Sequence, residues 1–148
     1  TGPLPPLTDL PNLQTFDVSV NRLSGSIPSL AGLTALIDFS LADNLFSGPF
    51  PPLTGLTRIF QFDVGDNLLT GPVPSFIDNP SLGAFGIRGN ELSGTLPDPP
   101  DSLYGANVCP NRFNPVPSAA WDSITRIHPW YRDCLPPPDA IYSDGFDG

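Results

Sequence analysis

The sequence repeats itself at intervals of 23 residues, and this period constrains the fold more than any other feature of the chain. Polar residues, glycines and prolines recur at that interval: Asn21, Asn44, Asn67 and Asn90; Gly25, Gly48, Gly71 and Gly94; Pro28, Pro51, Pro74 and Pro97. Apolar residues keep the same register in columns such as Leu10, Leu33 and Leu56; Phe16, Phe39, Phe62 and Phe85; and Val18, Leu41, Val64 and Ile87. One repeat cannot bury its apolar face alone, so the period predicts a solenoid of stacked repeats.

Each unit reads L-x-x-L-x-x-F-x-V/L-x-x-N-x-L-S/T-G-x-I-P. This pattern resembles the leucine-rich repeat in its plant-type form, which is marked by S/T-G-x-I-P. The alternation in F-x-V is typical of a half-buried strand, and stacked repeats place such strands about 4.8 Å apart. We therefore expect an α/β repeat solenoid with a parallel β-sheet on its concave face and a short C-terminal helical cap.

The repeats divide the chain into three parts. Residues 1–114 hold a half repeat, four full repeats and one shortened repeat; 115–134 form the cap; and 135–148 form a Pro-rich linker with an aromatic-acidic tail. Residues 1–5 match residues 70–74, so the chain opens inside a repeat, and we expect an open sheet edge there. In the cap, Ser118 should start a helix over about 119–128, with Trp121 and Ile124 covering the last core layer.

Two sets of residues have a predicted structural role. The Asn column is expected to turn inward as a ladder whose amides satisfy main-chain groups: Asn21, Asn44, Asn67, Asn90 and Asn111. Cys109 is expected in the last strand and Cys134 just beyond the cap helix, so a disulfide would join cap to solenoid. A reactive cysteine pair is the alternative, although the C-x-x-C spacing typical of such pairs is absent.

The outward strand positions are the candidate partner-binding residues on the concave face. They are Thr15, Asp17, Asp38, Ser40, Gln61, Asp63 and Arg88, flanked by the apolar Ile37 and Phe60. An acidic strip with apolar edges could hold a basic peptide or a sugar. A merely solvated sheet face is the alternative.

Composition argues against several function classes. The formal net charge of −9 disfavours nucleic acids and anionic membranes as partners, and no apolar run approaches the ~20 residues of a membrane span. An open sheet face is expected neither to raise a carboxyl pKa nor to exclude water, and the only histidine, His128, falls at the end of the cap helix. We therefore expect no enzyme activity, no cofactor and no metal site.

Residue usage and the tail bear on the compartment. The chain has no Lys and favours Arg, Ala, Asp, Gly and Pro, which is typical of a GC-rich bacterial genome. Its last eight residues resemble the ends of exported proteins of gammaproteobacteria. With the expected disulfide, these features indicate a bacterial protein that is secreted, or extracellular at the cell surface.

Three functions remain open. The first is a recognition module that binds a protein or glycan through the concave face. The second is a self-assembling protein, joined head to tail through its N-terminal end and the tail residues Ile141, Tyr142 and Phe146. The third is ice binding, which ranks last because the exposed columns are irregular.

Overall fold

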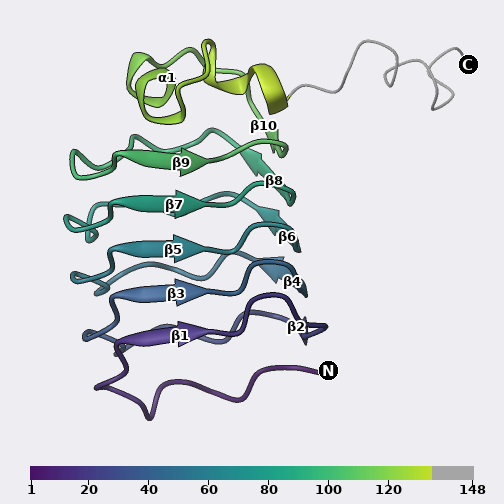
Figure 1. The fold of residues 1–148 in the computed structure, drawn as a ribbon, viewed down its shortest axis with the longest axis vertical. Helices are drawn as coiled ribbons and strands as arrows, with labels where there is room; N and C mark the ends of the chain where they lie inside the picture. Colours follow the sequence, from purple (N-terminus) through teal and green to yellow (C-terminus); the bar gives the residue numbers. More distant parts are fainter. Residues whose placement is uncertain (135–148) are drawn as a thin grey trace, which may run out of the picture.

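The chain winds into a solenoid of stacked, parallel strands with a helical cap at its C-terminal end (Figure 1). The computed structural model describes residues 1–134, so the expected tail residues Ile141, Tyr142 and Phe146 lie outside the described part. Two five-stranded sheets run along the stack, one on each of two neighbouring sides. The predicted parallel-sheet solenoid is confirmed.

The first sheet, called the main sheet below, contains one F-x-V strand from each repeat. Its parallel strands lie in the order β1 (Thr15–Asp17), β3 (Asp38–Ser40), β5 (Gln61–Asp63), β7 (Ala84–Gly86) and β9 (Gly105–Asn107). The central residues of the first four strands are phenylalanines that face inward, and their rings stack with centroids 5.2 to 6.0 Å apart. This stack of rings fixes the register, because a slip by one residue would turn every ring to solvent.

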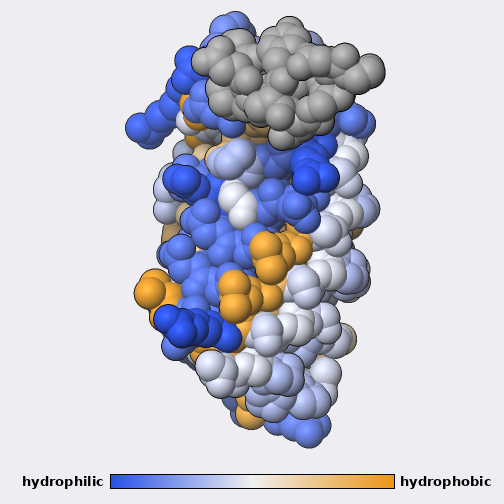
Figure 2. All heavy atoms as spheres, turned by 90° about the vertical axis from the view of Figure 1, so that its right-hand side faces the viewer, coloured by the Kyte–Doolittle hydropathy of each residue, from blue (hydrophilic) through white to orange (hydrophobic). Residues whose placement is uncertain are grey.

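A second sheet, called the side sheet, was not predicted. Its strands lie in the order β10 (Arg112–Phe113), β8 (Glu91–Gly94), β6 (Leu68–Gly71), β4 (Leu45–Pro49) and β2 (Ser24–Gly25). The glycines and prolines in these segments are typical of turns and extended chain rather than of strands. The turn residues instead pair between repeats, and Gly48 and Gly71 allow this with φ near +83° and +82°, where a side chain would cause strain. This side is mostly polar with a small apolar cluster (Figure 2).

The core fills the inside of the coil, where residues of both sheets meet those of the segments that connect them, and it is continuous through the stack. Leu33 and Leu56 are completely buried, as their column predicts. Leu10 occupies the equivalent position in its repeat, as the column predicts, but 45% of its surface is exposed. Leu10 belongs to the outermost turn of the described stack, where a neighbouring repeat covers the column from one side only.

The asparagine ladder links neighbouring repeats through their main chains. The Nδ2 group of Asn67 donates to the carbonyl oxygens of Leu41, Val64 and Gly65 at 3.0 to 3.1 Å, and its Oδ1 accepts from the amide of Phe46. Asn44, Asn90 and Asn111 are buried in equivalent positions. Asn21 differs, because it is exposed and donates only to carbonyls of its own turn.

The cap helix is shorter than predicted. Helix α1 spans Ala119–Thr125, and the hydroxyl of Ser118 accepts a hydrogen bond from the amide of Trp121, as a helix N-cap does. The expected end near His128 is wrong. Arg126 adopts the left-handed conformation with φ +61°, which ends the helix, and a 3-10 helix over Trp130–Cys134 follows.

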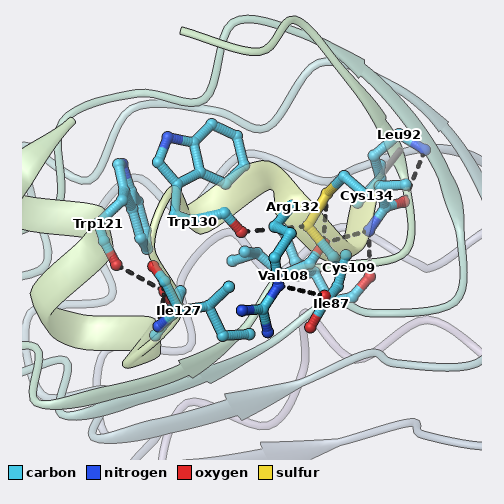
Figure 3. The surroundings of a disulfide bond; sticks show 12 residues. Ile87, Leu92, Val108, Cys109, Trp121, Ile127, Trp130, Arg132 and Cys134 are labelled. Atoms are coloured by element: carbon cyan, nitrogen blue, oxygen red, sulfur yellow. Dashed lines mark hydrogen bonds and ion pairs between the residues drawn. A yellow bond between two sulfur atoms is a disulfide. The ribbon is translucent and has the colours of Figure 1, made fainter. Parts of the chain in front are cut away.

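Two buried tryptophans and a disulfide fix the cap to the last repeat (Figure 3). The indole of Trp121 donates to the carbonyl of Pro97, and that of Trp130 donates to the carbonyl of Val116. The disulfide between Cys109 and Cys134 is present as predicted, although Cys109 follows β9 rather than lying within it. The cap therefore covers the last core layer and brings the end of α1 beside the main sheet.

Candidate binding face of the main sheet

The outer face of the main sheet presents two columns of side chains. The strand register aligns Thr15, Asp38, Gln61, Ala84 and Gly105 in one column, and Asp17, Ser40, Asp63, Gly86 and Asn107 in the other. The structure thus places six of the predicted site residues side by side on one face. The polar half of the face lies over β1, β3 and β5, and small residues follow on β7 and β9.

Arg88 does not join these columns. It lies after the end of β7, and its guanidinium pairs with Asp66 at 3.9 Å, with both side chains about half exposed. An exposed pair at this distance contributes little to stability. Arg88 therefore borders the face rather than forming part of its strand surface.

Aromatic rings form one edge of the face. Ile37, half-buried, and Phe60, exposed, precede β3 and β5 as expected. The ring of Phe60 leans toward that of Tyr104, with centroids 6.2 Å apart, and the two rings meet over Gly83. A Cβ at Gly83 would lie 2.7 Å from Tyr104 and 2.8 Å from Phe60, so only glycine permits this arrangement. Tyr104, which occupies the Phe60 position in the shortened repeat, was not among the predicted site residues.

A pocket of about 460 Å³ lies where the end of α1 approaches the main sheet. We call it the cap pocket; its lining includes Gln61, Asp63, Gly86, Tyr104, Gly105 and Arg126. Strands β7 and β9 contribute mainly small residues, which leaves the space open. The contribution of Arg126 was also missed, because the sequence did not show that the helix would end beside the sheet.

The carboxyl group of Asp63 is partly buried beside this pocket. Its Oδ1 accepts a hydrogen bond from the amide of Gly65 at 2.9 Å. Burial raises the pKa of Asp63 despite that hydrogen bond, and the negative charges of Asp66, Asp43 and Asp17 raise the pKa further. The expectation that the open sheet face would leave every carboxyl pKa unraised is therefore wrong at this position.

Asp17 occupies the same column in a fully solvated setting. Its carboxylate accepts hydrogen bonds from the hydroxyl and the amide of Ser19, and these bonds lower the pKa of Asp17. The two positions of the column therefore differ. Asp17 on the edge strand β1 is a solvated carboxylate, and Asp63 on the middle strand β5 is a partly buried carboxylate in a pocket.

Groups typical of other sites do not gather in the described part of the chain. Residues 1–134 hold no cluster of three or more His, Cys, Asp or Glu side chains suited to a metal ion. No helix among them has both the length and the apolar character needed to cross a membrane. His128 is exposed and lies 2.5 Å from Asp122, whose other carboxylate oxygen accepts from the amide of Trp130. These contacts join helix α1 to the 3-10 helix of the cap.

Comparison with known proteins agrees with the fold. The family model described as Leucine Rich Repeat matches residues 12–33, and no curated protein matches the chain. A crystal structure of a TDR receptor is 31% identical with a TM-score of 0.67, over 76% of this chain. The ectodomain of the Arabidopsis receptor kinase HAESA, in complex with a peptide hormone ligand, is 30% identical with a TM-score of 0.69 over 76%.

A third structure, of Pollen Receptor Kinase 3, is 25% identical with a TM-score of 0.60, and the match covers 72% of this chain and 60% of that one. The chain spans only about a fifth of the TDR and HAESA structures, at 21% and 20% of their lengths. The fold and these likenesses together show that the solenoid of this chain is similar to those of leucine-rich-repeat ectodomains.

Proposed function

We propose that this chain is a non-enzymatic recognition module that works outside the cell and binds an extended segment of a protein partner along the outer face of the main sheet. The observation that carries the proposal is the unbroken register of outward side chains across five strands, which ends in the cap pocket. Such a face offers a series of side-chain positions along the stack, which suits a segment longer than one residue.

The chemistry of the face supports binding rather than catalysis. Asp17 is exposed, and its pKa is lowered, so its carboxyl group stays ionised at neutral pH. An ionised carboxylate can bind a cation but cannot act as a general acid. Thr15 and Ser40 lie beside Asp38 and Asp63, but the described strands of the main sheet hold no histidine that could activate their hydroxyls. An open face also leaves water in contact with any reacting group.

Two observations support a location outside the cell. The disulfide between Cys109 and Cys134 is of a kind that persists in oxidising compartments. The HAESA structure is an ectodomain that holds a peptide hormone ligand. The absence of Lys from the sequence supports the further proposal that the protein is exported from a bacterium.

Charge favours a cationic partner. The face carries Asp17, Asp38 and Asp63, and the whole chain has a formal net charge of −9. Attraction between exposed charges is screened at higher ionic strength, so binding of the natural segment should weaken as salt is added.

A display experiment tests this proposal. A library of random 12-residue peptides is selected on the disulfide-bonded protein, and the enriched peptides are then measured against two variants. Gln61→Arg places a bulky cation in the middle of the main-sheet face, and Thr70→Arg places the same group on exposed β6 of the side sheet. The enriched peptides should lose at least about tenfold in affinity with Gln61→Arg and keep it with Thr70→Arg. Equal effects of the two variants would contradict the proposal.

Two alternatives predict different results. A glycan partner would give no enriched peptides but would show binding to a glycan array that Gln61→Arg abolishes. Head-to-tail assembly would give filaments whose mass, measured by light scattering, grows with concentration; its proposed tail residues lie outside the described part of the chain. Ice binding fits least well, since one column of the face runs Thr15, Asp38, Gln61, Ala84 and Gly105, with no regular hydroxyl array.

A further inference from the structure

The cap pocket differs from the rest of the main-sheet face in shape. Elsewhere the strands carry side chains that stand out to solvent, whereas the outward positions of β7 and β9 at the pocket are Ala84, Gly86, Gly105 and Asn107. The end of α1 adds Ile124, Thr125 and Arg126 on another side. The result is a space bounded by both sheet and cap, large enough to receive a side chain from a bound segment.

The position of the Asp63 carboxylate depends on two glycines. An ideal Cβ at Gly86 would lie 2.6 Å from Asp63 Oδ1 and 2.8 Å from its Cγ, so the carboxylate lies directly over a residue without a side chain. A Cβ at Gly65 would also lie only 3.2 Å from the same oxygen. The carboxylate therefore lies low against the sheet, at the wall of the pocket.

The charge at this wall has no cationic partner in residues 1–134. The carboxylate accepts one hydrogen bond, from the amide of Gly65, and none of the ion pairs formed by the described residues includes Asp63. Arg88 is directed to Asp66 instead. Three further carboxylates repel the charge of Asp63 and raise its pKa, and Arg126, which lines the same pocket, forms no ion pair with Asp63. A positive group from outside would relieve this repulsion.

The opposite edge of the pocket is apolar. Tyr104 lines the pocket and leans with Phe60 over Gly83, and both rings are exposed, by 63% and 43%. Exposed aromatic faces attract aliphatic stems and cations. The pocket thus combines a carboxylate, small residues from the strands and an aromatic edge.

We infer that the cap pocket is a subsite for one basic side chain of the bound segment, whose guanidinium or ammonium group pairs with Asp63 while its aliphatic stem lies on Ala84, Gly86 and Gly105. An acidic side chain would meet the repulsion of Asp63 and its neighbours. A neutral side chain of the same shape would leave the carboxylate partly desolvated without a cation. This inference rests on the proposed function, and it specifies one position of the segment that the function requires.

Asp17 provides a matched control within the same chain. It occupies the same column two strands away, and it accepts the equivalent hydrogen bond from the residue two positions later. It differs in lying in open solvent, with no pocket beside it. Replacing Asp17 or Asp63 by Asn removes the same charge and keeps an oxygen that can accept the main-chain hydrogen bond.

The test uses two small probes on the intact, isotope-labelled protein. The first is acetyl-Gly-Arg-Gly-amide, and the second carries citrulline, the neutral analogue of arginine with nearly the same shape. Titrations are followed through the amide signals of Gly65 and Gly86. The arginine probe should shift both signals and bind at least about tenfold more tightly than the citrulline probe, because charge-assisted hydrogen bonds are the stronger kind. Asp63→Asn should abolish that difference, and Asp17→Asn should leave it within about twofold.

A second variant separates shape from charge. The Cβ of a side chain at Gly105 would meet no atom within 4 Å, so Gly105→Val should occupy the pocket without disturbing the sheet. We expect this variant to lose the arginine probe while keeping the melting temperature of the parent protein. Equal binding of the two probes, or unchanged binding after Asp63→Asn, would overturn the inference.

The failure of this inference is distinguishable from failure of the proposed function. If display yields peptides that Gln61→Arg rejects but that neither require a basic residue nor respond to Asp63→Asn, the recognition face stands and the basic subsite is wrong. If the arginine probe binds at Asp63 but Gln61→Arg does not weaken the binding of longer peptides, the subsite stands and the extended face is wrong.

Discussion

Asp17 and Asp63 occupy the same register position of the main sheet, two strands apart, and each accepts a main-chain hydrogen bond of 2.9 Å from the residue two positions later. Their pKa values nevertheless move in opposite directions. Hydrogen bonds from the hydroxyl and amide of Ser19 lower the pKa of Asp17, whereas burial and neighbouring carboxylates raise the pKa of Asp63. The main chain is therefore equivalent at the two positions, and the neighbouring side chains cause the difference in pKa.

This contrast predicts opposite effects on stability. At neutral pH the ionised Asp63 costs stability, because its folded pKa is raised above the ordinary value of 3.8. Asp63→Asn should therefore raise the melting temperature at pH 7, and the gain should disappear as the pH falls through the raised pKa and below 3.8. Thermal melts of parent and variant across this range check it. A lower melting temperature for Asp63→Asn at pH 7 would show that the carboxylate is stabilised.

Asp17 should behave in the reverse way. Its lowered folded pKa means that its ionised form stabilises the fold above 3.8, and that this stability is lost as the pH falls through the lowered value. Asp17→Asn should thus lower the melting temperature at pH 7 and converge with the parent protein in strong acid. A variant that melts higher than the parent at pH 7 would contradict this account.

The asparagine ladder should carry much of the cohesion between repeats. Asn67→Ala leaves the amide of Phe46 and carbonyls of two repeats without their side-chain partner, which should cost about 1–3 kcal/mol of unfolding free energy. Asn21→Ala is the matched control, because the side chain of Asn21 is exposed and donates only within its own turn. Denaturant unfolding of both variants decides the matter, and equal losses would show that burial between repeats is unimportant.

Buried Asn79 offers a stabilising substitution. It occupies the column of Leu33 and Leu56, is fully buried, and its Oδ1 has no hydrogen-bond partner. Its Nδ2 donates to carbonyls of Leu53 and Leu56, but each of these already accepts a main-chain amide. Asn79→Leu should therefore raise the unfolding free energy by about 1 kcal/mol. A loss of stability would mean that the two side-chain hydrogen bonds outweigh the unpaired oxygen.

The disulfide should stabilise the cap more than the solenoid. Cys109 and Cys134 are 25 residues apart, and a loop of this length corresponds to about 3 kcal/mol in the chain-entropy account. Adding reductant should lower the melting temperature by the same amount as the double change Cys109→Ser and Cys134→Ser. Amide exchange should rise mainly in α1 and the 3-10 helix. An equal melting temperature with and without reductant would contradict this role of the disulfide.

Periodicity accounts for how much of the fold could be predicted from the sequence. The 23-residue period placed Phe39 and Phe62 inside and Asp38 and Gln61 outside, since a strand alternates its faces. The side sheet was missed because Ser-Gly and Thr-Gly read as turn residues, and nothing local shows that turns of neighbouring repeats will pair. Leu10 keeps its place in the column but stays partly exposed, because only one neighbouring repeat of the described stack covers it.

The candidate site was only partly predictable for a related reason. The columns of the main sheet follow from register, so Asp17 and Asp63 could be placed on one face from sequence alone. The cap pocket could not be placed, because it depends on where α1 ends. Helices often end at a glycine in the left-handed conformation, whereas here Arg126 adopts that conformation and gives no such signal in the sequence. The partial burial of Asp63 follows from that placement together with Gly86.

The central claim, recognition along the outer face of the main sheet, is tested most directly by mapping a selected 12-residue peptide onto the labelled protein through amide chemical shifts. We predict that the perturbed amides will cluster in β3, β5, β7 and β9 and around Arg126, with little change in the side sheet. Perturbations centred instead on β4, β6 and β8, around the exposed Leu45 and Leu68, would place recognition on the other sheet and contradict the account.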